Sequence, residues 1–297
     1  MTPAERLAVA ERPERRFALA LAAPAVAVLA ITTTFPLVYL LWQSLQNINL
    51  AMPGMDRFAG AENYVRMWED RRFWGALGFT VVYTGVTVAL QLVIGLAMAL
   101  LILQIPRAQW AFRVVAIVPI VLAPVVAGLF WRTLMLAPDF GILDFAFRSL
   151  GFGAHNWLGD PRLARASVIA IHTWQWTPFV FLYLLAALAA LPADLYEAAR
   201  IDRASAWRRF VHITLPLIRP AIVIVVILRM TVALSAFAAI YAATGGGPGT
   251  ATEIINLYAY RVSFAELSLG YGASAAVVLL VLTMAVAALL FHLRRAG

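Results

Sequence analysis

The chain has 297 residues, of which 63% are hydrophobic and 13% are charged, about half the charged share of a typical soluble domain. A soluble fold of this size would lack the charge needed to cover its surface, so the composition indicates an integral membrane protein. Lysine and cysteine are both absent. The chain therefore has no Walker A phosphate-binding loop, which needs lysine, and no disulfide, thiolate nucleophile or cysteine-ligated metal centre.

Six apolar stretches are long enough to cross about 30 Å of hydrocarbon as helices. They lie near residues 17–45, 76–103, 112–136, 166–190, 217–243 and 270–293. The first follows Arg15 and Arg16, but its apolar run is longer than the core of a secretory signal, so it is interpreted as a retained span. The sequence therefore predicts an all-α integral membrane protein with about six transmembrane helices.

Arginines are divided unequally between the two sets of alternate connections, with thirteen on the side of the N-terminus and eight on the other. Because arginine is enriched in cytoplasmic segments, both termini are predicted to lie in the cytoplasm. This prediction makes residues 1–16 a cytoplasmic arm, 17–293 a single membrane domain and 294–297 a cytoplasmic tail. The external segments are then those near 46–75, 137–165 and 244–269.

The segment 191–216, between the fourth and fifth stretches, is too polar to cross a membrane and too regular to be a linker. Asp194 is followed three residues later by Glu197, which has the form of a capping box and predicts a helix start. A break is expected at 202–205, and Pro216 is expected to end a second helical element. Such a helix pair suits docking into a partner's groove, although a helix that only joins two spans has the same periodicity.

Part of this segment resembles the EAA loop of ABC importer permeases, on the residues Glu197, Ala198, Ala199, Asp202, Ala204, Phe210, Ile213, Leu215 and Pro216. In that family the loop forms a coupling helix, which sits in a cleft of the ATPase subunit and transmits its motion. The resemblance assigns ATPase coupling to Glu197, Ala198, Ala199, Asp202, Arg203, Ala204, Trp207 and Phe210. Arg203 departs from the family, which usually has glycine there, a residue suited to positive φ or close packing.

Three further segments are similar to the carbohydrate branch of that family, namely 58–64, 174–179 and 244–248. The last reads Thr-Gly-Gly-Gly-Pro, and because no lysine follows it, a nucleotide-binding loop is not indicated. The family implies an external loop facing the solute-binding protein and formed by Gly245, Gly246, Gly247 and Pro248. A flexible turn is the alternative interpretation.

Arg229 lies about ten residues into the fifth stretch, counted from Pro220, and therefore near the membrane midplane. A charge at that depth normally faces protein or water and marks a transport path, and a purely structural pairing is the alternative. Sugars are usually held by aromatic faces with hydrogen-bonding side chains at their edges. The remaining substrate-path candidates on this basis are Trp174, Gln175, Trp176, Thr177 and Ser235, each of which packing would also explain.

The resemblance implies a type I ABC importer permease fold and uptake of a carbohydrate by alternating access, without chemistry on the substrate. The substrate class is a disaccharide, an oligosaccharide, or a related polyol or glycerol-phosphate compound. The implied setting is a bacterial or archaeal cytoplasmic membrane. The implied partners are two ATP-binding subunits that carry Mg-ATP, a second and non-identical permease, an external sugar-binding protein and membrane lipid, with no nucleic acid and no cofactor in this chain.

Two other classes of membrane protein fit the residues less well. An ion-coupled secondary transporter commonly needs an acidic site near the midplane, and none of the six stretches holds an Asp or Glu. A membrane-embedded enzyme would need a convergent nucleophile, metal or acid–base set. The four histidines are scattered without metal-ligand spacing, and only His172 is a buried base in the predicted spans, so neither a metal site nor a catalytic site is predicted.

Overall fold

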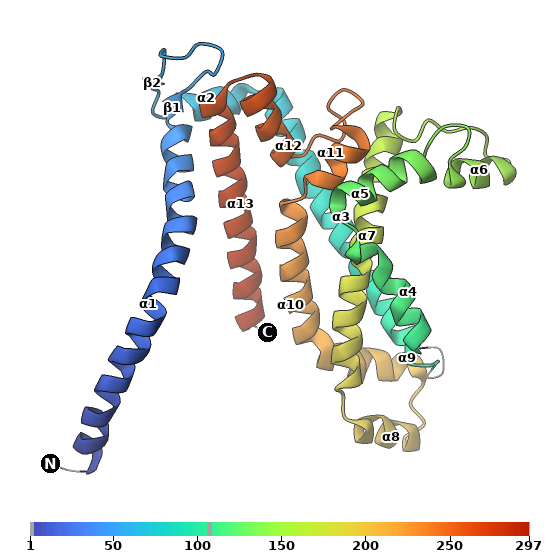
Figure 1. Ribbon diagram of the computed structural model, residues 1–297. Coiled ribbons are helices and arrows are strands. Elements are labelled where there is room, and N and C mark those ends of the chain that lie inside the picture. The colour runs from blue at the N-terminus through green and yellow to red at the C-terminus, as the bar shows by residue number, and fades with distance from the viewer. Residues whose placement is uncertain (1–2, 106–108, 297) are drawn as a thin grey trace.

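The computed structural model describes the backbone of residues 3–105 and 109–296, and within these the side chains of 17–292 apart from 18 and 19. Long helices run side by side through the molecule (Figure 1). Within the described residues, five of them are long and apolar enough to cross a membrane, or six if a bent helix pair counts as one span, which confirms the predicted class. The five are α1 (Pro3–Ser44), α3 (Arg71–Ile102), α7 (Pro161–Ala189), α10 (Leu215–Leu234) and α13 (Leu269–Ala296).

The shorter elements gather at the two ends of the molecule (Figure 1). One end carries α8 (Ala193–Ile201), α9 (Ala206–Arg209) and the π-helix η3 (Phe210–Thr214). The other end carries β1 (Gln46–Asn47), β2 (Arg57–Phe58), α2 (Glu62–Glu69), α6 (Ile142–Ser149), α11 (Ala238–Thr244), α12 (Ile255–Tyr260) and the π-helix η4 (Arg261–Ala265). We call these the α8 end and the loop end.

The third predicted span, 112–136, is sharply bent. The chain forms α4 (Gln109–Val121) and then α5 (Pro124–Phe130), which continues as the π-helix η2 (Trp131–Met135), with a bend of 99° between the two parts. Pro124 explains the bend, because a proline disfavours helical geometry in the residue before it, and Ala123 is extended at φ −57° and ψ 139°. The side-chain amide of Gln175 donates to the freed carbonyl of Leu122 at 3.0 Å.

The fifth predicted span, 217–243, is also interrupted. Helix α10 ends at Leu234, and α11 begins only at Ala238. The Asn256 side-chain amide donates to the carbonyls of Leu234 and Ala236 at 3.4 and 3.3 Å, so the backbone at this break is satisfied inside the protein. Helices α5 and α11 then pack closely, since a Cβ on Gly128 would lie 2.5 Å from the carbonyl oxygen of Ala239.

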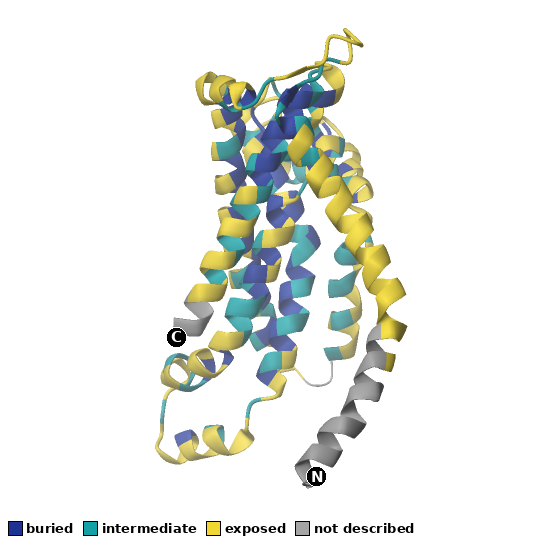
Figure 2. Cartoon of the chain, turned by 90° about the vertical axis from the view of Figure 1, so that its left-hand side faces the viewer, coloured by how far each residue is buried: buried dark blue, intermediate teal, exposed yellow. Residues whose placement is uncertain are grey.

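Helix α1 stands apart from the bundle over most of its length (Figures 1 and 2). Its apolar part, 20–44, is not buried inside this chain. Only its loop end is fixed, where the Asn63 amide donates to the carbonyls of Ser44 and Gln46, both at 2.9 Å. The cytoplasmic arm 1–16 and tail 294–297 were predicted from their arginines, and those side chains lie outside the described residues.

The most extensive helix packing joins α3 and α7. A Cβ on Gly95 would lie 3.0 Å from both the Phe181 backbone nitrogen and the Val180 Cγ1 atom. Small residues matter at such contacts in a membrane, where lipid supplies no hydrophobic drive and association depends on close van der Waals packing. The apolar cluster beside it contains Ala99, Ile102, Val180, Phe181, Leu184, Leu185, Leu188, Ile218 and Val225.

We predict that Gly95→Val pushes α3 and α7 apart and lowers the free energy of unfolding by about 1–3 kcal/mol, the usual effect of overpacking. Gly85→Val is the matched control, because it lies on the same helix with no atom within 4 Å of an added Cβ. Thermal unfolding of the two purified variants in detergent measures the difference. Equal unfolding midpoints would contradict the close contact at Gly95.

Candidate functional site

The segment 191–216 forms two helices around a sharp turn. Helix α8 begins at Ala193 with Pro192 at its N-cap and no capping side chain, so the predicted capping box is wrong. Asp194 instead lies in the first turn, where its negative charge interacts favourably with the helix dipole. The break at 202–205 is confirmed, but Pro216 does not end the second helix, because it lies in the first turn of α10, directly after η3.

The turn between α8 and α9 depends on Arg203, whose φ is +52°. That left-handed conformation costs a non-glycine residue about 1–2 kcal/mol. It explains why glycine suits this position. Arg203 adopts the backbone geometry of the usual glycine while placing an exposed guanidinium on the turn.

Helix α8 is attached to the bundle by one face only. The hydroxyls of Tyr196 and Thr214 share a hydrogen bond of 2.9 Å, and Ala199 is buried on the same side. Other predicted coupling residues face outwards, and these are Glu197, Ala198, Asp202, Arg203 and Trp207, whereas Ala204 and Phe210 are half-buried. Helix α8 is therefore accessible on its outer face, while its inner face is held by Tyr196 and Ala199.

A buried polar cluster lies within the bundle around Arg229, which is 1% exposed. Its Nε donates to Gln91 Oε1 at 2.9 Å and its Nη2 donates to His172 Nε2 at 3.2 Å. Its guanidinium carbon lies 4.4 Å from the centre of the Trp176 ring. Among the described side chains, no carboxylate is paired with Arg229. The guanidinium thus joins α3, α7 and α10 through neutral groups, and sequence reasoning missed Gln91 as its partner.

Beside this cluster, a cavity of about 380 Å³ opens where the two broken spans meet. Its wall includes Pro124 and Phe237 from the breaks, together with His172, Gln175, Trp176 and Ser235. The Oε1 atom of Gln175 is buried without a hydrogen-bond partner in the described part of the chain. We call this space the inner cavity. Three predicted path residues, Gln175, Trp176 and Ser235, line it.

Two other predicted path residues lie elsewhere. Trp174 and Thr177 face a separate apolar space of about 610 Å³ between α3, α4 and α7. Trp174 stacks on Phe130 with ring centres 5.9 Å apart. With 3.6 residues per turn, these two side chains point away from the face of α7 that carries His172, Gln175 and Trp176. The same periodicity could have shown that His172 belongs with the cavity residues.

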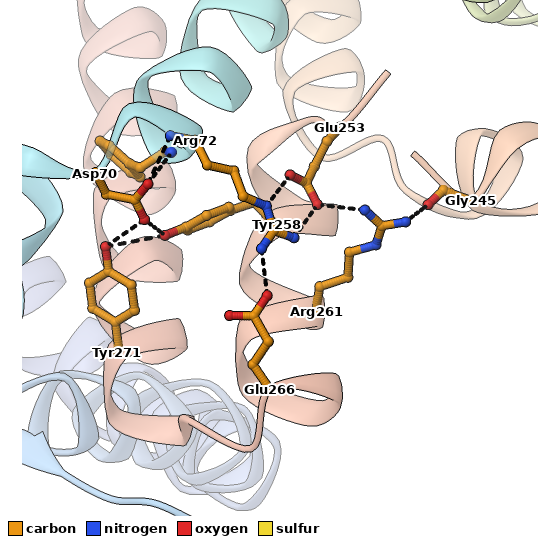
Figure 3. A network of polar contacts seen from close by, with 9 residues as sticks. Asp70, Arg72, Gly245, Glu253, Tyr258, Arg261, Glu266 and Tyr271 are labelled. Carbon is orange, nitrogen blue, oxygen red and sulfur yellow. Dashed lines mark hydrogen bonds and ion pairs between the residues drawn. The ribbon is translucent and has the colours of Figure 1, made fainter. Parts of the chain in front are cut away.

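The loop end is held by an ion network that sequence reasoning missed (Figure 3). Glu253 is fully buried and accepts two hydrogen bonds of 2.7 Å from Arg72 and one of 3.0 Å from Arg261. Arg72 also donates to Glu266 at 2.5 Å, and Arg261 donates to the carbonyl of Gly245. The network therefore connects the loop 244–248, which we call the glycine-rich loop, to the start of α3 and to η4.

The glycine-rich loop is closed by side chains as well as by this network. The hydroxyls of Thr244 and Thr252 are 2.7 Å apart, and Thr252 Oγ1 donates to the Gly247 carbonyl at 2.9 Å. Gly245 and Gly246 have φ of +59° and +95°, and a Cβ on Gly246 would lie 2.8 Å from the Leu257 side chain. Glycine thus makes the backbone conformation of this loop accessible.

Asp70 completes the loop end by capping α3. It accepts hydrogen bonds from the Tyr258 and Tyr271 hydroxyls at 2.5 and 2.9 Å and from two backbone N–H groups. Burial alone would raise the pKa of Asp70, but these hydrogen bonds outweigh it and hold that pKa below its usual value. Ionised Asp70 therefore stabilises the folded chain at neutral pH, and this contribution is lost as the pH falls through its folded-state pKa.

Comparison with known proteins identifies the chain. Residues 91–296 match the family described as "Binding-protein-dependent transport system inner membrane component". The chain belongs to this family. It is therefore a multi-pass inner-membrane permease and a transport subunit, as predicted.

Relatives of the permease support the same assignment. It is 36% identical over 282 residues to the sulfoquinovosyl glycerol transport system permease protein SmoG of Agrobacterium fabrum, covering 95% of this chain and 91% of the relative. It is also 36% identical to the trehalose/maltose transport system permease protein MalF of Thermococcus litoralis, over 80% of each chain.

A solved structure confirms the predicted type I importer permease fold. It is that of a bacterial ABC transporter involved in the import of the acidic polysaccharide alginate. The TM-score is 0.82 at 22% identity, and the match covers 97% of this permease and 98% of that chain.

We predict that Glu253→Gln destabilises the permease by up to about 3 kcal/mol, since it removes the buried carboxylate that Arg72 and Arg261 share. Glu266→Gln is the control, because Glu266 is 49% exposed and such pairs contribute less than about 1 kcal/mol. The unfolding midpoint in detergent distinguishes the two. A larger shift for Glu266→Gln would refute the central position of Glu253.

Proposed function

We propose that the permease is the transmembrane subunit of an ATP-driven importer that translocates a carbohydrate by alternating access. The names of its relatives support this substrate class, since they refer to sulfoquinovosyl glycerol, trehalose and maltose. The substrate would be a disaccharide, an oligosaccharide, or a related polyol or glycerol-phosphate compound. The observation that carries the proposal is the inner cavity, which lies where two interrupted spans meet.

The chemistry of the inner cavity suits a sugar. Trp176 offers an aromatic surface, and Arg229 stacked against it fixes the ring. Gln175 and Ser235 add polar side chains to its wall, and Ser235 lies at the end of α10. Interrupted helices at such sites are typical of transporters, because their freed backbone lines a cavity. In this proposal Trp174 and Thr177 are packing residues.

Coupling would run from α8 to the inner cavity. An ATPase subunit would hold the exposed face of α8, including Glu197 and Ala198, in its cleft. Helices α9, η3 and α10 follow one another without a gap and end at Leu234, next to Ser235. Closure of two ATPase subunits on Mg-ATP would therefore move the wall of the cavity through one helical element.

The proposed assembly contains partners on three sides. The exposed apolar length of α1 and the open side of the inner cavity support a second permease that completes the pathway, and the family resemblance implies that it is non-identical. Of the two ATP-binding subunits, one would dock at the α8 end of this chain and the other on the second permease, and we assign the α8 end and both termini to the cytoplasm. A sugar-binding protein would dock at the loop end, which carries Gly245, Gly246, Gly247 and Pro248.

The proposal is tested by reconstituting the complex with its genetic neighbours in proteoliposomes. ATPase activity is measured with the binding protein and, in turn, trehalose, maltotriose, diacetylchitobiose and an alginate pentasaccharide. We expect at least one carbohydrate to stimulate ATP hydrolysis several-fold. Absence of any stimulation, with all subunits present, would contradict the carbohydrate assignment.

We predict that Glu197→Ala abolishes most of this stimulation while the chain stays inserted and folded, because Glu197 is exposed on α8 and supports no described contact within this chain. Met284→Ala is the control, because Met284 is 63% exposed on α13, away from both the α8 end and the loop end. Co-purification of the ATPase and its sugar-stimulated rate are measured for both. Full stimulation in Glu197→Ala would exclude the coupling role.

A further inference from the structure

A second pocket of about 620 Å³ lies at the loop end, next to the glycine-rich loop. Its wall contains two arginines and three aromatic rings, from Arg132, Arg261, Tyr241, Tyr260 and Phe264. We call it the outer pocket. It is separate from the inner cavity and none of its side chains takes part in the coupling described above.

The aromatic rings of the outer pocket lead towards the inner cavity. Phe264 and Tyr260 have ring centres 5.5 Å apart, and Tyr260 lies 5.7 Å from Tyr241 and 5.3 Å from Phe237. Phe237 and Tyr241 are stacked at 5.4 Å. Because Phe237 also lines the inner cavity, an unbroken series of rings joins the two spaces.

These rings are accessible, unlike the rings of a packed core. Tyr241, Tyr260 and Phe264 are 47%, 39% and 60% exposed. Their flat apolar faces match the C–H faces of sugar rings, and the tyrosine hydroxyls add polar edges. The combination of apolar surface with a few placed polar groups is that of a ligand site.

The two arginines give the outer pocket hydrogen-bond donors in fixed positions. Arg261 is held by buried Glu253 and by the carbonyl of Gly245, and it therefore cannot turn away freely. Arg132 donates to the Ala242 carbonyl at 3.4 Å. Guanidinium groups held in this way donate to hydroxyl or carboxylate oxygens in a defined geometry.

We propose that the outer pocket is an entry site, where a carbohydrate stacks on Tyr241, Tyr260 and Phe264 before it passes Phe237 into the inner cavity. This inference rests on the proposed function and adds a second sugar site to it. An aromatic belt at the membrane interface would also expose such rings, but it would not need an arginine anchored by a buried carboxylate.

Because the chain contains no cysteine, a single introduced cysteine reports the accessibility of its own position in this chain. Ala265→Cys places it in the wall of the outer pocket, and Ser149→Cys places the control on α6, where the residue is exposed and away from the pocket. The assembled complex, with cysteine-free partner subunits, is labelled by a membrane-impermeant maleimide. The probe is whichever of trehalose, maltotriose, diacetylchitobiose and the alginate pentasaccharide stimulates the wild-type ATPase most.

We expect the probe at saturating concentration to slow labelling of Ala265→Cys at least about threefold by occupying the pocket, and to leave Ser149→Cys unchanged. An unchanged rate with a stimulating probe would overturn the inference and leave the proposed function intact. Labelling of the chain alone but not of the complex would also overturn it, since the second permease would then cover the pocket. Failure of all four carbohydrates to stimulate is instead a failure of the proposed function.

A second variant separates sugar stacking from a structural role of the ring. We expect Tyr260→Leu to raise the KM for the transported sugar about tenfold with kcat unchanged, since a tenfold change corresponds to about 1.4 kcal/mol, which is within the range of an aromatic contact. Tyr260→Phe keeps the ring and should behave as wild type. Phe145→Leu, a ring that is 69% exposed on α6, is the matched control. A fall in kcat without a change in KM would contradict the entry site.

Discussion

The requirement that polar groups in a membrane find partners within the protein explains most of this structure, and Arg229 is its strongest instance. A buried guanidinium is costly in hydrocarbon unless its donors are satisfied. Gln91, His172 and the Trp176 ring satisfy it from two other helices. The wall of the inner cavity is therefore fixed by a charge that lies just behind it.

The same requirement explains why the spans can break where they do. Each interruption frees carbonyl groups, and a side-chain amide from another element donates hydrogen bonds to them. Gln175 donates to Leu122 in the third span, and Asn256 donates to Leu234 and Ala236 in the fifth. Both breaks border one cavity, so the residues that stabilise them also shape the space through which a substrate would pass.

Sequence reasoning succeeded where a pattern is local. Apolar length predicted the spans, and the resemblance of the segment around Glu197 predicted the family. Sequence reasoning failed where the structure depends on a contact between residues that are far apart in the chain. Pro119 stays within α4 whereas Pro124 begins α5 directly after the break, and no local rule separates them. Glu253 and Arg72 are 181 positions apart, so their pairing has no local signal. Trp174 and Trp176 both read as sugar-binding aromatics, although the helix turns them to different spaces.

The proposed function is tested most directly by uptake of a radiolabelled carbohydrate into proteoliposomes that enclose ATP and hold this permease with its partner subunits. With the loaded binding protein outside, we expect accumulation that requires internal ATP and this chain, and that persists when ionophores abolish ion gradients. Uptake that proceeds without ATP or an ATPase, and stops when the ion gradient collapses, would contradict it and indicate an ion-coupled transporter.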